Sequence, residues 1–372
     1  MAVVGLGAIG SGAVAALAGR GHSVIGLDRF STPHSMGSSH GETRMIREAY
    51  YQGSMYVPMV QAAYAGWADL EARSGRPLLT ITGGLMIGRP DSHVFGGCRR
   101  TARALDLSHE ELTASEVRDR FPAFRLETGT RAILEHRAGF LDLDGCLEAL
   151  LTIASDGGSD LRFGERVTRW SVQAGVAIVE TPTAEVRARR LVLAAGAWMG
   201  SLTPSLDLPL DVERTVQYWF APATAGAADL FDPARCPGWV WEYGPRTTWY
   251  GFPLIGSGIK VDMHVEDGRL ADPETVRREV GEGETVAMRG VLGRFMPDAN
   301  GEEKGASVCM YTNTPDEHFI LDRHPNHPEV TLFAGGSGHG FKFARVIGEI
   351  LADLATARDP AHDLTPFRAT RF

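Results

Sequence analysis

The sequence predicts an α/β fold with two domains, one built on a parallel sheet and an α+β second domain built on a mostly antiparallel sheet. Three observations support this prediction. The chain opens with an apolar strand, a glycine-rich turn and a helix. Continuous apolar runs at 190–198 and 331–336 have the pattern of strands that are buried on both faces. Residues 215–315 are instead rich in aromatic and β-branched residues, which favour β structure.

The first element is a β-α-β unit over residues 2–28. In its turn, Gly7 permits the close approach of a pyrophosphate, and Gly10 permits tight packing of the following helix. The strand Ser23–Leu27 ends at Asp28, where a carboxylate can accept a hydrogen bond from a ribose hydroxyl. Strand, turn, helix and terminal carboxylate at these spacings indicate a Rossmann-like dinucleotide site.

The later elements follow from apolar periodicity and from glycine and proline breaks. We expect a helix at Val57–Ser74, strands at 83–88 and 140–142, an antiparallel pattern at Leu161–Glu180, the two apolar strands named above, and a helix at Lys342–Ala355. The dinucleotide domain is therefore expected to be discontinuous. It comprises 1–75, 150–214 and 320–372, and the substrate-binding domain comprises 76–149 and 215–319.

Composition excludes several classes of protein. Of the 372 residues, 44% are apolar and 22% charged, as in soluble globular proteins. The net charge of -9 argues against a nucleic-acid partner. No run reaches the roughly 20 apolar residues of a membrane span, and the start lacks the basic flank of a signal peptide, so we expect a cytoplasmic protein. The four cysteines have no metal-ligand spacing, which predicts neither a metal site nor a disulfide framework.

Reactive side chains recur at alternate positions in two segments. Cys309 and Tyr311 are two residues apart, so in a strand they point to one face. Lys260, Asp262 and His264 are spaced in the same way. A lone, well-placed thiol in a dinucleotide-binding chain favours a tethered flavin.

Positive side chains come from distant parts of this acidic chain. Arg44 and Arg47 share a face if their segment is helical. Lys260 and Lys342 add two further cations. Together they predict a pocket for an anion, most simply a carboxylate.

Five segments make a more specific resemblance, which extends along nearly the whole chain. They are 37–44 (GSSHGETR), 250–253 (YGFP), 309–319 (CMYTNTPDEHF), 337–343 (SGHGFKF) and 363–368 (DLTPFR). The chain resembles the family of monomeric sarcosine oxidase and N-methyltryptophan oxidase, within the D-amino-acid-oxidase-like flavoproteins. The last segment and the spacing from Tyr250 to Lys260 resemble the N-methyltryptophan branch.

The resemblance implies an FAD-binding domain and FAD attached through its 8α-methyl group to Cys309. It places Arg44 below the flavin, with His40 nearby, and this chain has Ser39 where many relatives carry a second histidine. The expected cofactor contacts are Gly5, Gly7, Ala8, Ile9, Gly10, Asp28, Arg29, Ser38, His40, Thr43, Arg44, Val167, Gly196, Cys309, Gly338, Gly340, Phe341 and Lys342.

The resemblance also implies catalytic roles. Arg47 and Lys342 match the clamp for the substrate carboxylate, and Lys260 matches the lysine that activates oxygen. The pocket residues that match are Tyr250, His264, Tyr311 and His339. His264 and the two tyrosines are expected to position the amine, because amine oxidation needs a neutral amine in a near-attack geometry rather than a strict base.

The implied reaction is oxidation of a secondary, N-methyl amino acid. The imine hydrolyses to an amino acid and an aldehyde, and oxygen is reduced to hydrogen peroxide. Expected partners are therefore the small amino acid and O2, with no nucleic acid or membrane, and the protein is expected to be a monomer.

Three alternatives remain open. An NAD-dependent dehydrogenase is compatible with the glycine turn and Asp28, but it leaves Cys309 without a purpose. A related oxidase could act on a cyclic imino acid or another secondary amine, because the wall of the pocket sets the substrate specificity. Candidate residues for this wall are Val240, Trp241 and Tyr243. The third alternative is a flavoprotein that binds without turnover.

Overall fold

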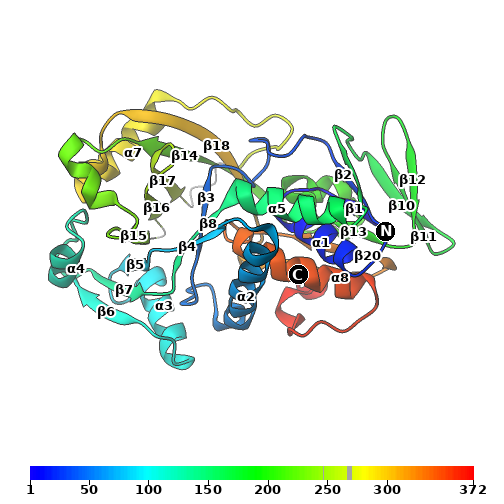
Figure 1. Ribbon diagram of the computed structural model, residues 1–372, viewed down its shortest axis with the longest axis horizontal. Helices are drawn as coiled ribbons and strands as arrows, with labels where there is room; N and C mark the ends of the chain where they lie inside the picture. The colour runs from blue at the N-terminus through cyan, green and yellow to red at the C-terminus, as the bar shows by residue number, and fades with distance from the viewer. Residues whose placement is uncertain (246, 266–269) are drawn as a thin grey trace.

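The computed structural model describes residues 1–245, 247–265 and 270–372. Two large sheets lie toward opposite ends of the long axis of the molecule (Figure 1). One has six strands and the other has eight. The predicted fold class is confirmed: a Rossmann-like sheet is combined with a second, mostly antiparallel one.

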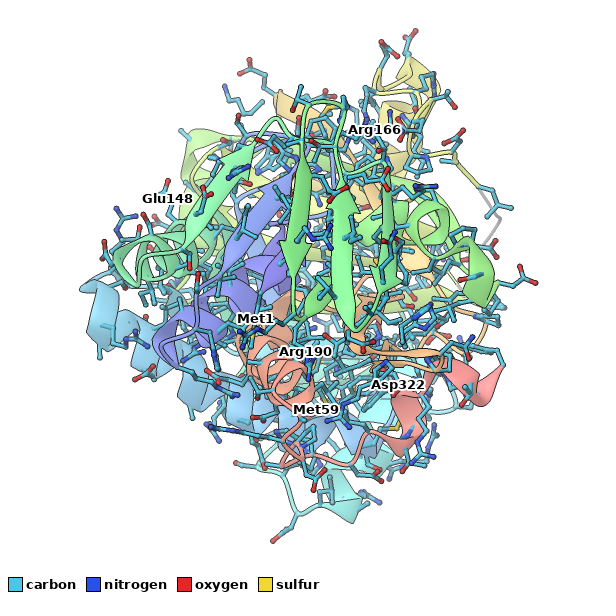
Figure 2. All side chains as sticks on the ribbon, turned by 90° about the vertical axis from the view of Figure 1, so that its right-hand side faces the viewer. Met1, Met59, Glu148, Arg166, Arg190 and Asp322 are labelled. Carbon is cyan, nitrogen blue, oxygen red and sulfur yellow. The ribbon has the colours of Figure 1, made fainter. Side chains whose placement is uncertain are left out.

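The six-stranded sheet contains both ends of the chain. In spatial order its strands are β19 (Ile320–His324), β20 (His327–Ala334), β13 (Leu191–Leu193), β1 (Ala2–Val4), β2 (Ile25–Asp28) and β9 (Asp160–Phe163). Only the β19–β20 pair is antiparallel. Figure 2 shows Met1 and Arg190 close together where β1 and β13 begin, and the amide of Ala2 donates to the Arg190 carbonyl at 2.9 Å.

Alternation along these strands separates two apolar layers. Val3 and Val192 belong to a core shared with α1 (Ala8–Gly19), α2 (Val57–Ser74), α5 (Leu143–Asp156) and α8 (Ala344–Ala355). Their strand neighbours Val4 and Leu193 face a small antiparallel sheet of β10 (Arg169–Gln173), β11 (Val176–Glu180) and β12 (Glu185–Ala188). The six-stranded sheet is thus covered by helices on one face and by this three-stranded sheet on the other (Figure 1).

The eight-stranded sheet forms the second domain. Its order is β18 (Glu303–Asn313), β14 (Asp211–Phe220), β17 (Gly258–Val265), β16 (Thr247–Ile255), β15 (Gly238–Gly244), β5 (Gly84–Gly88), β7 (Arg131–Glu135) and β6 (Glu110–Thr113). The β5–β15 pair is parallel and the other pairs are antiparallel. The helices of this part of the chain are α3 (His93–Ala104), α4 (Ala114–Arg120) and α7 (Glu282–Phe295), whereas the short α6 (Met199–Leu202) packs against the six-stranded sheet.

The two faces of this sheet differ in chemistry. One face, including Val216, Val261 and Trp249, packs against α7 in an apolar core. On β14, Thr215 and Gln217 alternate with Val216 and so point to the other face, where their cross-strand partners are Cys309 of β18 and Asp262 of β17. We call this second side the polar face, and it is the side that faces the cavity described below.

A second small sheet supplies the segment between the two domains. It consists of β3 (Thr43–Ile46), β8 (Gly139–Asp142) and β4 (Leu79–Ile81). Residues 43–46 are therefore a strand, whereas the shared face expected for Arg44 and Arg47 required a helix. Extended backbone separates the two side chains, since Arg44 and Arg47 are an odd number of residues apart.

Helix α2 has the predicted bounds. The antiparallel pattern predicted from Leu161 was wrong at its start, because β9 joins the parallel sheet beside β2 and the antiparallel strands begin at Arg169. The domain boundaries stay a prediction, and the expected boundary at residue 149 falls inside α5. None of the described helices has the length and apolar composition required to cross a bilayer.

Candidate active site

A cavity of about 360 Å³ lies where the two large sheets meet. On one side it is lined by the glycine turn and by the segments that follow β2, β13 and β20. On the other side it is lined by residues of β15, β16, β17 and β18. Ligands of open α/β sheets bind outside the carboxyl ends of the parallel strands, which is where this cavity lies.

The glycine turn has the geometry that a dinucleotide requires. Gly5 has a φ of +90°, and a Cβ on it would lie 2.5 Å from the carbonyl oxygen of Ala194. A Cβ on Gly10 would lie 1.7 Å from the carbonyl oxygen of Gly5. Because no side chain fits at either position, the backbone stays bare where the turn leads into α1. Gly7 and Ala8 line the cavity there.

Asp28 is fixed at the end of β2. One carboxylate oxygen accepts from the amide of Leu6 at 2.7 Å, and the other accepts from the amide of Phe30 at 2.8 Å. The carboxylate lines the cavity, so its remaining lone pairs can accept from a ribose hydroxyl. Arg29 also lines the cavity, and its guanidinium forms an ion pair with Glu274 at 2.6 Å.

The loop between β2 and β3 lies against β18. The Ser38 hydroxyl donates to the carbonyl of Met310 at 2.6 Å. The Arg44 guanidinium donates to the carbonyls of Ser38 and His40 at 2.8 and 2.7 Å. Arg44 therefore fixes the shape of this loop, and Ser38 holds the loop against the strand that carries Cys309.

The Cys309 thiol is fully buried on the polar face. Its sulfur lies 3.9 Å from the carbonyl oxygen of Ser38. Burial raises the pKa of this thiol, and the positive charge of Arg44 acts in the opposite direction. Its neighbours along β18, Met310 and Tyr311, line the cavity.

Lys260 lies next to the same loop. Its ammonium donates to the carbonyl oxygens of Gly41 at 2.5 Å and Thr43 at 2.9 Å. Burial, and next the charge of Arg44, lower its pKa well below the usual value. Only 2% of the Lys260 side chain is exposed.

Several buried polar atoms near Lys260 lack a hydrogen-bond partner among the described residues. Within the described residues, His40 Nε2, Thr43 Oγ1 and both polar atoms of the Gln217 amide are buried without a hydrogen bond. Buried polar groups in folded proteins nearly always have a partner. A polar ligand or ordered water beside this loop would supply these missing partners.

Two buried cations line another part of the cavity. Arg47 donates to the carbonyl of Ala49 at 2.5 Å and to Gln52 Oε1 at 3.1 Å. Lys342 donates to the Tyr50 hydroxyl at 3.0 Å and to the His339 carbonyl at 2.9 Å. Among the described residues, neither cation forms an ion pair with a carboxylate. Burial, and next the charge of Arg47, lower the pKa of Lys342 well below its usual value.

His339 supports Lys342 through a chain of hydrogen bonds. Its Nε2 lies 3.0 Å from the carbonyl oxygen of Glu317, so this nitrogen carries the proton. The other nitrogen, Nδ1, then accepts from the Tyr50 hydroxyl at 3.0 Å. Both ring nitrogens are used within the protein. His339 therefore holds Tyr50 and Lys342 in place.

An aromatic wall stands on the polar face. The hydroxyls of Tyr250 and Tyr311 lie 3.3 Å apart, and the His264 ring stacks on Tyr311 with centroids 4.8 Å apart. Burial lowers the pKa of His264 to about 4, so its imidazole is neutral near neutral pH. The Tyr250 hydroxyl donates to Asp262 Oδ2 at 2.9 Å.

The structure gathers the predicted site residues around one cavity. Those that line it are Gly5, Gly7, Ala8, Ile9, Asp28, Arg29, Ser38, Arg44, Arg47, Val167, Gly196, Tyr250, His264, Tyr311, Gly338, His339, Gly340, Phe341 and Lys342. Gly10, His40, Thr43, Lys260 and Cys309 lie behind this lining, each in contact with a lining segment. Of the candidates for the pocket wall, only Val240 lines the cavity; Trp241 packs in the core on the opposite face.

Sequence reasoning missed Tyr50, Gln52 and Gln217. Nothing in their local sequence marks them, because their contacts come from distant segments. A compositional signal does mark two of the predicted residues. Only three of the 37 basic residues are lysines, namely Lys260, Lys304 and Lys342. Two of these three are buried at the site.

This fold and cavity define a dinucleotide-dependent enzyme. The family described as FAD dependent oxidoreductase matches residues 1–354, and the chain belongs to it. The predicted family resemblance is confirmed by two relatives. The monomeric sarcosine oxidase of Streptomyces avermitilis is 40% identical, over 99% of this chain and 96% of the relative. The N-methyl-L-tryptophan oxidase of Salmonella arizonae is 35% identical, over 98% of both chains.

Solved structures agree with the fold. NikD, described as an unusual amino acid oxidase essential for nikkomycin biosynthesis, superposes with a TM-score of 0.85 at 26% identity. The match covers 99% of this chain and 96% of NikD. Glycine oxidase from Geobacillus kaustophilus superposes with a TM-score of 0.83 at 21% identity, which is a likeness of fold.

Proposed function

We propose that this protein is an FAD-dependent oxidase of N-methyl or other secondary amino acids, with O2 as the electron acceptor. The observation that carries the proposal is the pair of buried cations, Arg47 and Lys342, which have no carboxylate partner among the described residues. Buried cations without a direct ion pair are costly, so two of them together favour an anionic ligand, although the buried Glu135 carboxylate acts on Arg47 from a distance. The two relatives named above are oxidases named for N-methyl amino acids.

The residues around the cavity fit FAD. The bare glycine turn and Asp28 suit the pyrophosphate and the adenosine ribose, and the unpartnered atoms of His40 and Thr43 suit a polar group near Lys260. When bound, FAD supplies the redox chemistry, taking two electrons from the substrate and passing them to oxygen. The protein binds and orients the substrate, and it sets the charges around it.

Arg47 and Lys342 bind the substrate carboxylate. An ammonium has three N–H donors, and two of those on Lys342 are already used by Tyr50 and His339. The third remains for a ligand. With the carboxylate fixed at one end, Tyr250 and Tyr311 hold the amine at the other, so one substrate orientation is favoured. The neutral His264 stacks on Tyr311 and helps to position the amine rather than serving as a strict base.

Lys260 acts in the oxygen half of the reaction. Reduction of oxygen develops negative charge, which a positioned cation stabilises. The buried Lys260 ammonium is held beside the loop 41–43 by two carbonyl oxygens. A developing anion next to it favours the charged form of the lysine and counteracts the burial that lowers its pKa.

We also propose that Cys309 carries the cofactor as a thioether. The proposal is supported by its burial on the cavity side of β18 and by its position beside Arg44. The test is acid precipitation of purified protein followed by mass spectrometry. Yellow colour that stays with the precipitate, and an intact mass that includes the cofactor, are expected. Colour released entirely to the supernatant would contradict a covalent bond.

The activity itself is tested by a peroxide-coupled screen over sarcosine, N-methyltryptophan, pipecolate and proline. We expect oxidation of at least one of the first two compounds with release of formaldehyde. Preference for pipecolate or proline would support the alternative, an oxidase of cyclic imino acids. A colourless protein that reduces NAD would indicate a dehydrogenase instead. A monomeric state and a cytoplasmic location remain expectations, which gel filtration and cell fractionation can check.

A further inference from the structure

Asp262 is a carboxylate in the middle of the polar face. It is fully buried, and its cross-strand neighbours are Gln217 of β14 and Tyr250 of β16. A buried carboxylate is costly unless it is hydrogen-bonded. Among the described residues, its side-chain partners are three hydroxyl groups: Thr215 donates to Oδ1 at 2.5 Å, and Tyr250 and Tyr311 lie 2.9 and 3.5 Å from Oδ2.

These contacts fix the direction of the hydrogen bonds in the aromatic wall. An ionised carboxylate can only accept, and each phenol has a single proton. Tyr250 gives its proton to Asp262. Tyr311 gives its proton either to Asp262 or to the Tyr250 oxygen, which is 3.3 Å away. In both arrangements the two protons are used inside the cluster. The phenol oxygens that line the cavity can then only accept hydrogen bonds.

We propose that Asp262 is a positioning residue that turns the Tyr250–Tyr311 wall into an acceptor, so that it receives an N–H group of the substrate amine. The inference rests on the proposed function and deepens it. The cavity then has a cationic end at Arg47 and Lys342 for the carboxylate, and an acceptor end for a nitrogen that carries at least one proton. Ligands that present an ether oxygen at this end meet two acceptors and bind more weakly than the amine.

The protonation state of Asp262 controls this preference. Among the described residues, the titratable and charged groups coupled to its charge are Tyr218 of β14, Tyr250 of β16, Lys260 of β17, Cys309 and Tyr311 of β18, and Arg44 of β3, and His264 lies against the two wall tyrosines. Burial raises the pKa of Asp262 to about 7. Above that pH the carboxylate accepts, and the wall receives N–H donors. Below it, the protonated carboxyl group can donate, and a phenol proton becomes free to point into the cavity.

The test compares three probes of similar shape: sarcosine, its ether isostere methoxyacetate, and the apolar butyrate. Dissociation constants of methoxyacetate and butyrate are measured by calorimetry on the holoenzyme. That of sarcosine is obtained from rapid mixing without oxygen. At a pH of about 8, Asp262→Asn should raise the dissociation constant of sarcosine about tenfold and lower that of methoxyacetate. The reason is that the carboxamide can donate to a phenol oxygen, which frees a phenol proton for the ether oxygen. Butyrate binding should stay within about twofold.

Thr215→Val is the matched variant. It removes a hydroxyl from the same carboxylate but leaves both phenol contacts, so the preference for sarcosine over methoxyacetate should persist. If Asp262→Asn does not fold, the wild-type enzyme still provides a test, since lowering the pH from about 8 to about 6 should shift the preference toward methoxyacetate. Equal weakening of all three probes, or no change in their ranking, would overturn the inference. Wild-type oxidation of secondary amino acids, measured separately, tests the proposed function.

Discussion

The substitution Lys342→Met removes one charge from the carboxylate site with little change in volume. The lysine ammonium donates to the Tyr50 hydroxyl at 3.0 Å and to the His339 carbonyl at 2.9 Å, and its third donor is free for a ligand. Methionine fills similar space but cannot donate a hydrogen bond. The substitution therefore isolates the contribution of this cation to substrate binding.

Its magnitude follows from the burial of the site. Removing one member of a buried, hydrogen-bonded charge pair costs about 2–5 kcal/mol. Because Arg47 still contacts the carboxylate, we expect the lower part of this range, about 2–3 kcal/mol, which corresponds to roughly 30- to 150-fold weaker binding. The assay is the substrate dependence of flavin reduction without oxygen, which gives a dissociation constant separately from the rate.

Stability should change in the opposite direction. The pKa of Lys342 is lowered in the folded protein, so the ammonium costs free energy of folding at neutral pH, and this cost is absent only above the unfolded pKa. We expect the ligand-free melting temperature of Lys342→Met to equal or exceed that of the wild type. The control is Lys304→Met on β18, whose lysine is exposed and pairs with Glu302 at 2.6 Å. A dissociation constant within threefold of that of the control would refute the clamp.

Three further predictions concern other residues of the cavity. Lys260→Met should leave reduction by substrate fast and slow the reaction of the reduced enzyme with oxygen at least tenfold, as rapid mixing can measure; equal slowing of both steps would contradict this role. Cys309→Ser should fold normally but release its yellow colour on acid precipitation, whereas retained colour would show that another residue carries the cofactor. His264→Asn should alter substrate affinity but keep the wild-type pH profile between about pH 6 and 9, because burial keeps the imidazole neutral there. A lost ionisation in that range would assign it to His264.

The parts of the site that sequence could predict are those set by local periodicity. Alternation placed Lys260, Asp262 and His264 on one face, and the structure has them on β17 in that arrangement. The β-α-β unit was likewise predictable, because its glycines and Asp28 act through neighbouring backbone. Periodicity did not reveal the role of Asp262, since its hydroxyl partners come from three other strands.

The remaining features depend on contacts between distant segments. The chain of hydrogen bonds from Lys342 through Tyr50 to His339 joins residues nearly 300 positions apart, with separations of 292 and 289. No local pattern predicts such a contact. The strand at 43–46 was also hidden, because its partner β8 lies almost a hundred residues later and four residues carry little periodicity.

The scarcity of lysine gives the protein an unusual surface chemistry. Two of its three lysines are enclosed beside the cavity, and Lys304 is the exposed one, with 43% of its side chain accessible. Amine-reactive reagents should therefore acylate Lys304 and the terminal amino group while the enclosed pair is spared. A dye or a solid support could be attached through Lys304, on the strand that carries Cys309 but several residues before it, and the modified enzyme should retain its turnover.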